Sequence, residues 1–158
     1  MQLATPEDTR GLGRSLAPLL RAGDLVVLVG PLGAGKTQLV QGIGAGLGVR
    51  GAITSPTFVI SRVHPPDPSR GGRLPLVHVD AYRLGDVAEV DDLDLDADVD
   101  AAVTVVEWGA GLVEQLTDGY LEIRLDRDED SEVRTATLLA HGGDWARRLE
   151  RLGVPAGQ

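Results

Sequence analysis

Short apolar runs and helical spacings along the chain predict an α/β protein. Several runs lack polar interruptions, which is typical of strands buried on both faces of a parallel sheet. We expect strands at Leu25–Val29, Thr57–Val63, Leu74–Asp80, Thr104–Glu107, Tyr120–Leu125 and Arg134–Ala140. After the first of these runs, Leu39, Ile43 and Leu47 recur at helical spacing and predict a helix.

Two further helices are predicted near the ends of the sequence. Thr5, with Pro6 next and Asp8 three residues on, is typical of a helix N-terminus. The apolar face of this helix would contain Leu12, Leu16, Leu19 and Leu20. Pro18 is expected to kink or shorten it. A closing helix begins near Asp144, and its apolar side would be formed by Trp145, Leu149 and Leu152.

The segment GPLGAGKT lies between the first strand and its helix. Gly30, Gly35, Lys36 and Thr37 complete the pattern G-x-x-x-x-G-K-[ST], in the strand, loop and helix order that the motif requires. Backbone amides of the loop and the helix N-terminus would face phosphate groups. Lys36 would reach the β and γ phosphates, and the Thr37 hydroxyl would bind Mg²⁺. Nucleotide contacts are expected from Gly33, Ala34, Gly35, Lys36, Thr37 and Gln38.

The motif and the length together predict the fold class. A chain of 158 residues is long enough for one full hydrophobic core. We expect one P-loop NTPase domain over residues 1–158, an α/β fold with a mixed, mainly parallel sheet flanked by helices.

Composition narrows the chemistry. The formal net charge of -9 argues against direct, tight binding of nucleic acid. Because the chain has no cysteine, a metal would be held by oxygen or imidazole ligands, which favours Mg²⁺. Lys36 is the one lysine among 15 basic residues, and a compact ammonium suits a wrapped phosphate better than a wide guanidinium does. We see no signal peptide or membrane span and expect a cytoplasmic protein.

Two carboxylates end apolar runs. Asp80 ends LVHVD and Glu107 ends VTVVE, and open α/β sheets bind ligands beyond the carboxyl ends of their strands. Both are candidates for the metal and for the attacking water, although either residue could instead be a simple strand end. His78 shares a strand face with Asp80, but a lone histidine is more often a packing or hydrogen-bonding residue. We leave it outside the catalytic set.

The turn Ser55-Pro56-Thr57 follows the P-loop at about the distance of an NTPase switch. The Thr57 hydroxyl could sense the γ phosphate. The same residues also fit a simple turn that enters a strand, because Pro56 favours an extended Ser55.

The acidic run VDDLDLDADVD invites comparison with an EF-hand. Asp96, Asp98, Asp100 and Glu107 stand at positions 1, 3, 5 and 12 of such a loop. Ala101 stands where the sharp turn requires glycine, so we favour a solvated acidic face that repels nucleic acid or meets a basic partner.

The motifs GPLGAGKT, SPTF, HVDAYRL and VEW, in this order and at these separations, resemble the TsaE family of small bacterial ATPases. The resemblance covers most of the chain. It implies a P-loop ATPase that works with TsaB and TsaD proteins in making threonylcarbamoyladenosine beside the anticodon of tRNA. The partners would carry the transfer chemistry, while ATP binding and hydrolysis by the small subunit would reset the complex between turnovers.

The resemblance also implies roles for single positions. Lys36 and Thr37 would serve phosphate and Mg²⁺. Asp80 and Glu107 would serve metal and water, and Ser55 and Thr57 would form the switch. By looser alignment, the nucleotide would also be met by Thr9 and Arg134. The edge of the site or the partner surface would include Trp108, Tyr82 and Arg83, the last as a candidate arginine finger.

Two other functions remain open. A small-metabolite kinase shares the P-loop, and RVHPPDPSRGGR could act as its lid, but no acceptor-binding residues are visible. A nucleotide-dependent docking module would use binding rather than hydrolysis as its output. A GTPase is less favoured still, because its guanine-reading Asn-Lys-x-Asp pattern cannot occur without asparagine or a second lysine.

Overall fold

The computed structural model describes residues 1–31, 33–51, 53, 61–80, 100–107 and 119–153, with Asp80 described by its backbone. Within these residues, seven strands form one sheet in the order β1-β7-β6-β2-β5-β4-β3. The strands are β1 (Gln2–Leu3), β2 (Leu25–Val29), β3 (Ser61–His64), β4 (Leu76–Asp80), β5 (Val103–Glu107), β6 (Tyr120–Arg127) and β7 (Arg134–His141). The helices are α1 (Pro6–Leu16), α2 (Lys36–Leu47) and α5 (Trp145–Glu150), with 3₁₀ turns η1 (Ala17–Leu19) and η2 (Pro68–Arg70).

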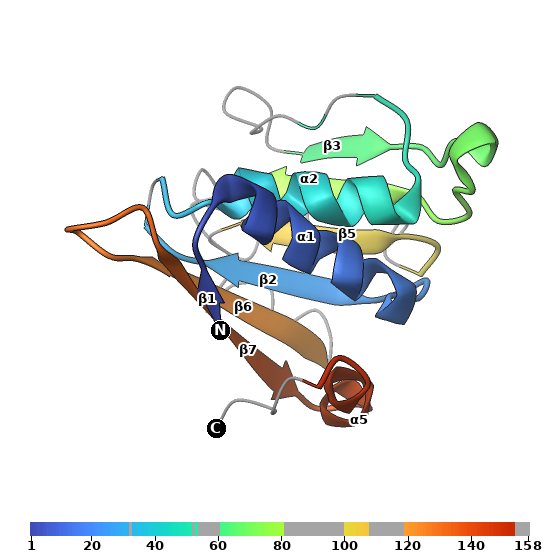
Figure 1. Cartoon of the computed structure of the whole chain (residues 1–158). Coiled ribbons are helices and arrows are strands. Elements are labelled where there is room, and N and C mark those ends of the chain that lie inside the picture. The colour runs from blue at the N-terminus through green and yellow to red at the C-terminus, as the bar shows by residue number, and fades with distance from the viewer. Residues whose placement is uncertain (32, 52, 54–60, 81–99, 108–118, 154–158) are drawn as a thin grey trace.

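The centre of the sheet is parallel and its two sides are antiparallel. β2 pairs in parallel with β5 and β6, and β4 pairs in parallel with β5. β7 and β3 add antiparallel strands at the two sides, and β1 pairs antiparallel with β7. Helices α1 and α2 lie side by side across one face (Figure 1). The predicted α/β fold with a mixed, mainly parallel sheet and flanking helices is confirmed.

Burial explains why the central strands are continuous apolar runs. Val26 and Leu28 of β2 belong to the core formed with α1 and α2. Val27 points to the opposite face, yet it is fully buried as well. All residues of β5 are also buried. A strand covered on both faces has no reason to alternate apolar and polar residues.

The first helix begins as the sequence predicts. Thr5 Oγ1 accepts a hydrogen bond from the Asp8 amide at 3.1 Å, and the Asp8 carboxylate accepts one from the Thr5 amide at 3.0 Å. This reciprocal capping box satisfies amides that the helix itself leaves unpaired. The helix ends at Leu16 and continues as η1, which contains Pro18, so the proline shortens the helix as expected.

α1 and α2 pack so closely that their contact requires glycine. A Cβ atom on Gly42 would lie 2.0 Å from the Arg10 carbonyl oxygen, and one on Gly13 would lie 2.4 Å from the Leu39 carbonyl oxygen. Neither position has room for a side chain. We call Arg10, Gly13, Leu39 and Gly42 the helix seam. The glycine-rich sequence of α2 lowers its helix propensity but allows this close packing.

The closing helix is held by Arg148, which is buried. Its guanidinium donates to Asp24 Oδ2 at 2.5 Å and to Asp144 Oδ1 at 2.8 Å, and it lies 4.3 Å above the Trp145 ring centre. Asp24 immediately precedes β2, so these contacts tie α5 to the amino end of that strand. We call Asp24, Asp144, Trp145 and Arg148 the amino-end cluster. The expected apolar side of the helix packs against the core through Trp145, Leu149 and Leu152.

Strand ends differ from the predictions for local reasons. β4 begins at Leu76, after Pro75, which has no amide hydrogen for the ladder. β6 continues two residues beyond Leu125, to Arg127. The predicted strand Thr57–Val63 is described only from Ser61, where β3 begins and runs to His64.

The acidic run does not continue into an EF-hand loop. Glu107, which that alternative needed as its last ligand, ends β5 inside the sheet. Asp96 and Asp98 lie outside the described residues. Among the helices of the described ranges, none is both long and apolar enough to span a membrane.

Candidate nucleotide-binding site

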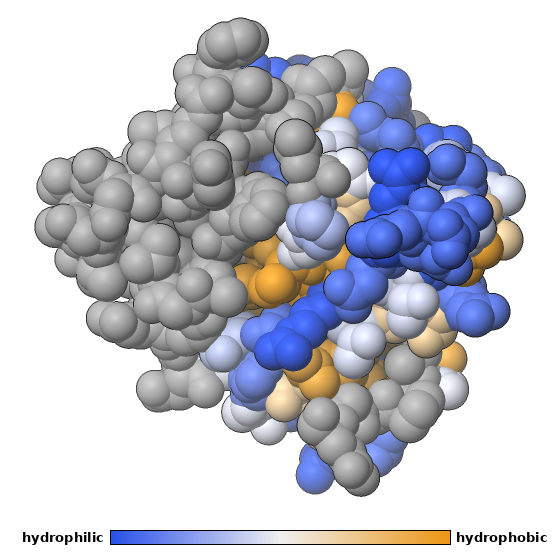
Figure 2. All heavy atoms as spheres, turned by 90° about the vertical axis from the view of Figure 1, so that its left-hand side faces the viewer, coloured by the Kyte–Doolittle hydropathy of each residue, from blue (hydrophilic) through white to orange (hydrophobic). Residues whose placement is uncertain are grey.

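The four parallel strands end at one edge of the sheet. β2 leads into the P-loop, and the other three end at Asp80, Glu107 and Arg127. The register pairs Glu107 with Leu28 on one side and with Asp80 on the other. The sheet thus places Glu107 on the strand next to β2, which leads into the P-loop, and Asp80 one strand further along the same edge. Figure 2 faces this edge, whose described surface is largely hydrophilic with hydrophobic areas between.

The backbone of the P-loop depends on glycine at defined positions. A Cβ atom on Gly30 would lie 2.4 Å from the Leu125 carbonyl oxygen, so the loop starts in direct contact with β6. Gly33 and Gly35 have φ values of +80° and +103°, which side chains strongly disfavour. Gly35 caps α2 without a side-chain hydrogen bond. The cap residue therefore offers no side chain to the first turn of α2, and a helix N-terminus of this kind suits an anion.

Lys36 lies inside this loop rather than on the surface. Its side chain comes from the first position of α2, and the residue is 6% exposed. The ammonium donates to the Gly30 carbonyl at 2.6 Å and to the Pro31 carbonyl at 3.1 Å. The charge is thereby held at the centre of the loop. Thr37 follows on the same turn and is half-buried.

α1 and α2 each place one further predicted residue at the loop. Thr9 is buried, and its Cγ2 methyl would be the nearest atom, at 3.7 Å, to a Cβ atom on Gly35. Gln38 on α2 accepts a hydrogen bond from Arg10 on α1. Thr9 and Gln38 therefore lie at the loop, where the nucleotide is expected to bind.

The hairpin of β6 and β7 places two arginines beside Gly33. Arg134 donates to the Gly33 carbonyl at 3.3 Å, consistent with its expected place near the nucleotide. The Arg127 guanidinium lies 3.8 Å from the position that a Cβ atom on Gly33 would take. Glu132 pairs with both arginines, at 3.4 Å and 3.7 Å. Arg127 was not among the predicted residues, because the apolar alternation of β6 stops two residues earlier.

Glu107 is the buried carboxylate of the site. It is 4% exposed, and its Oε2 lies 3.1 Å from Nε2 of His78, which is fully buried on β4. His78 is thus a hydrogen-bonding residue, as expected, but its partner is a predicted catalytic residue. The backbone of Asp80 pairs with Glu107, while its side chain lies outside the described part. Ser55, Thr57, Tyr82, Arg83 and Trp108 also lie outside the described residues.

His64 on β3 is a second buried histidine, which the register places opposite Leu76 at the start of β4. Burial lowers its pKa below the ordinary value of 6.5, and repulsion from His78 and Arg62 lowers the pKa further. A hydrogen bond with the Arg50 backbone opposes this shift. The fold therefore disfavours protonation of His64.

The oxygen donors of the site suit a magnesium nucleotide. Within the described residues, no group of three or more histidines and carboxylates could hold a metal alone. Mg²⁺ at phosphate sites usually takes one or two protein oxygens together with phosphate oxygens and water. The Thr37 hydroxyl, Asp80 and Glu107 are residues that could supply them.

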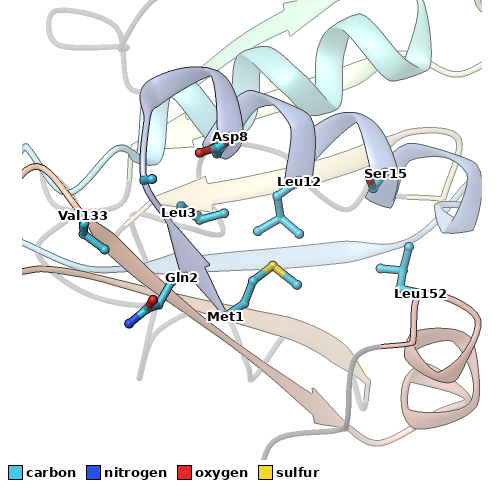
Figure 3. Close-up of a pocket in the computed structure, with 9 residues that line it drawn as sticks. Met1, Gln2, Leu3, Asp8, Leu12, Ser15, Val133 and Leu152 are labelled. Carbon is cyan, nitrogen blue, oxygen red and sulfur yellow. The ribbon is translucent and has the colours of Figure 1, made fainter.

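A separate cavity of about 550 Å³ opens between β1, α1 and the C-terminal part of the described chain. Figure 3 shows Leu3, Leu12, Val133 and Leu152 around it. None of the described P-loop residues lines it. Asp8, the one acidic residue among its described lining, is part of the capping box. We assign this cavity no part in nucleotide chemistry.

The family comparison agrees with this geometry. The family model described as "Threonylcarbamoyl adenosine biosynthesis protein TsaE" matches residues 3–136. The chain belongs to the TsaE family. A Streptomyces coelicolor protein named tRNA threonylcarbamoyladenosine biosynthesis protein TsaE is 60% identical over 141 residues, covering 87% of this chain and 93% of that protein.

Less similar proteins support the same family assignment. The Mycobacterium tuberculosis protein of that name is 53% identical over 137 residues, covering 83% of this chain and 80% of its own. The Bacillus subtilis protein is 37% identical over 148 residues, covering 93% and 89%. The crystal structure of Bacillus subtilis YdiB superposes with a TM-score of 0.77 at 30% identity, covering 97% of this chain and 92% of that chain. The expected family is therefore confirmed.

Proposed function

We propose that this TsaE-family chain binds and hydrolyses ATP with Mg²⁺ in tRNA threonylcarbamoyladenosine biosynthesis. The observation that carries the proposal is the buried Lys36 ammonium inside a glycine loop, beside the strand that ends at the buried Glu107. A cation within a cradle of amides suits phosphate, and a neighbouring carboxylate suits metal and water.

Residues around the loop would each contact a different part of the nucleotide. The amides of Gly33 to Gln38 and the Lys36 ammonium would hold the phosphates. Thr9 and Arg134, which both lie against glycines of the loop, would contact the same nucleotide. Arg127 joins this group because it lies beside Gly33.

Thr37, Asp80 and Glu107 would hold the metal and the attacking water. Bound Mg²⁺ would offset charge that develops on the phosphate oxygens. Asp80 or Glu107 would orient the water for in-line attack on the γ phosphorus. Ser55 and Thr57 would sense the γ phosphate, and Trp108, Tyr82 and Arg83 would lie at the site or partner edge. We expect slow hydrolysis by the chain alone, with a partner completing the site.

The proposed partners are TsaB and TsaD proteins, whose complex would carry the threonylcarbamoyl transfer. ATP turnover by this chain would reset that complex in the cytoplasm. Because the net charge is -9, tRNA would be met through the complex rather than by this surface. The local field of loop amides, lysine and metal is sufficient to hold ATP despite the overall charge.

The direct test measures ATP hydrolysis by the purified protein with Mg²⁺, alone and with TsaB and TsaD. Hydrolysis should depend on Lys36, as shown by loss in Lys36→Ala, and should change when the partners are added. Activation of the complex by a nonhydrolysable ATP analogue as efficiently as by ATP would instead support a docking module. Phosphoryl transfer to a metabolite in a substrate screen would support a kinase.

Asp80 can be tested separately. Asp80→Ala should weaken hydrolysis and the activity of the complex, because it removes an oxygen from the metal and water site. Full retention of both activities would show that Asp80 has no such role.

A further inference from the structure

His78 is the described hydrogen-bond partner of the Glu107 side chain. The histidine is fully buried, Glu107 is 4% exposed, and Nε2 lies 3.1 Å from Oε2. A carboxylate oxygen can only accept, so the imidazole Nε2–H donates. The two residues stand on adjacent parallel strands, where register places His78 opposite Val105, two positions before Glu107. Strand pairing thus holds the donor just behind the carboxylate.

The hydrogen bond from His78 stabilises the buried Glu107 carboxylate and restricts its side-chain torsions. A buried carboxylate without hydrogen-bond donors is costly, and a glutamate side chain has several torsions that must be fixed before it can act. His78 Nδ1 has no hydrogen-bond partner within the described part of the chain. The described polar contact of the ring is therefore the one to Glu107, which marks the histidine as a donor dedicated to that carboxylate.

We propose that His78 is a positioning residue for Glu107. Its Nε2–H occupies Oε2 and fixes the torsions of the side chain, so that Oε1 is the oxygen presented to Mg²⁺ or to the attacking water. The inference rests on the proposed ATPase function and deepens it. His78 itself touches neither nucleotide nor metal. Its effect passes entirely through Glu107.

The test compares His78→Leu with His78→Gln. Leucine fills the space but removes the donor, whereas the glutamine amide can replace imidazole Nε2. The Mg²⁺ concentration for half-maximal ATP hydrolysis should rise about 10- to 100-fold in the leucine variant, as for other donors behind metal ligands. The glutamine variant should recover most of the wild-type value.

His64→Leu is the matched control. His64 is also a buried histidine, on the adjacent strand, and has no described contact with Glu107. Thermal unfolding measures the general cost of losing a buried histidine in either variant. The shift in Mg²⁺ dependence should occur for His78→Leu and not for His64→Leu. Equal shifts in both variants would overturn the positioning role.

A double variant separates the role of Glu107 in hydrolysis from the role of His78 in positioning it. If His78 acts through Glu107, adding His78→Leu to Glu107→Gln should change the Mg²⁺ dependence no further. Glu107→Gln without effect on hydrolysis would refute the role of Glu107 in the proposed function. A strong effect of Glu107→Gln with none of His78→Leu would refute only the positioning role.

If His78→Leu does not fold, a second pair of variants tests the same hydrogen bond. His78→Asn and His78→Gln have the same amide, but the shorter asparagine places it near the position of Nδ1, out of reach of Oε2. Glutamine should preserve Mg²⁺ dependence and asparagine should not. Equal behaviour of the two would contradict the hydrogen-bond mechanism.

Discussion

The two ends of β2 hold buried cations in different ways. At the amino end, Arg148 is bonded to two carboxylates of its own chain, Asp24 and Asp144, and stacks on Trp145. At the carboxyl end, Lys36 donates to the carbonyl oxygens of Gly30 and Pro31. The described carboxylate partners of Arg148 are supplied by the fold itself. The described contacts of Lys36 include backbone carbonyls of the loop, and its side chain comes from the first position of α2.

This difference indicates what each end of the strand is for. A buried cation that is bonded to carboxylates contributes mainly to the closed structure, because breaking the pair leaves a buried charge. A cation held at the mouth of a helix N-terminus is suited to a ligand that brings negative charge. We therefore expect substitutions at the amino end to change stability and substitutions at the carboxyl edge to change nucleotide chemistry.

The largest expected effect is at the amino-end cluster. Arg148→Met should lower the free energy of unfolding by about 3–5 kcal/mol, because Asp24 stays buried without its cation. Urea unfolding measures this loss, and ATP affinity of the folded protein should stay close to wild type. The double variant Asp24→Asn/Arg148→Met should regain part of the stability. If ATP affinity fell together with stability in Arg148→Met, the two ends of β2 would not have separate roles.

Lys36→Ala should show the opposite pattern. We expect hydrolysis to fall about 100- to 1000-fold, the usual cost of removing one group that stabilises transition-state charge. Urea unfolding without nucleotide should change much less than in Arg148→Met. Lys36→Arg keeps the charge but not the compact shape, so it should also be impaired. Wild-type turnover by Lys36→Ala would refute the assignment of the loop.

The helix seam lies between the two ends and should give an intermediate effect. Gly42→Ala forces a Cβ atom to within 2.0 Å of the Arg10 carbonyl oxygen, and such overpacking costs about 1–3 kcal/mol. Gly11→Ala is the control, because its Cβ would have only the Arg14 side chain nearby, at 3.8 Å. That variant should gain up to about 1 kcal/mol from helix propensity. Unfolding by urea distinguishes them, and equal stability would contradict the close packing.

The smallest expected effect is the acid sensitivity of the amino-end cluster. Burial alone would raise the pKa of Asp144, but the hydrogen bond from Arg148 and the charges of Arg148 and Arg21 hold that pKa below its ordinary value of 3.8. A depressed folded-state pKa contributes stability above the unfolded value and loses it as pH falls through the folded value. The stability of Asp144→Asn should therefore approach that of wild type as pH falls below about 4.

Circular dichroism during thermal unfolding from pH 7 to pH 3 would measure this small difference. A stability gap that does not narrow with acid would show that the Asp144 charge contributes nothing. The exposed position of Asp144 explains why we rank this effect last.

Local sequence signals predicted the parts of the site that local chemistry determines. The P-loop and the Thr5 capping box are short motifs whose residues are close in sequence, and the structure has both in the expected context. Glu107 was predicted as a site residue because it ends an apolar run, which marks the ligand edge of a parallel sheet.

Contacts set by tertiary packing could not be predicted in this way. The bond between His78 and Glu107 joins residues 29 positions apart and depends on the register of β4 and β5. Arg127 reaches Gly33 only because β6 continues past its apolar alternation. The glycines of the helix seam lower the helix propensity that the sequence predicts. Glycine is needed there because the backbone of the neighbouring helix leaves no room for a Cβ atom.

Lys36 also makes this protein unusual for amine chemistry. Because it is the one lysine of the chain, every lysine-directed modification that removes charge, such as acetylation, has a single side-chain target. That target is 6% exposed and bonded inside the P-loop. The rate at which its amine reacts with a small acylating reagent would report directly on how often the loop opens, and a bound nucleotide should slow that reaction.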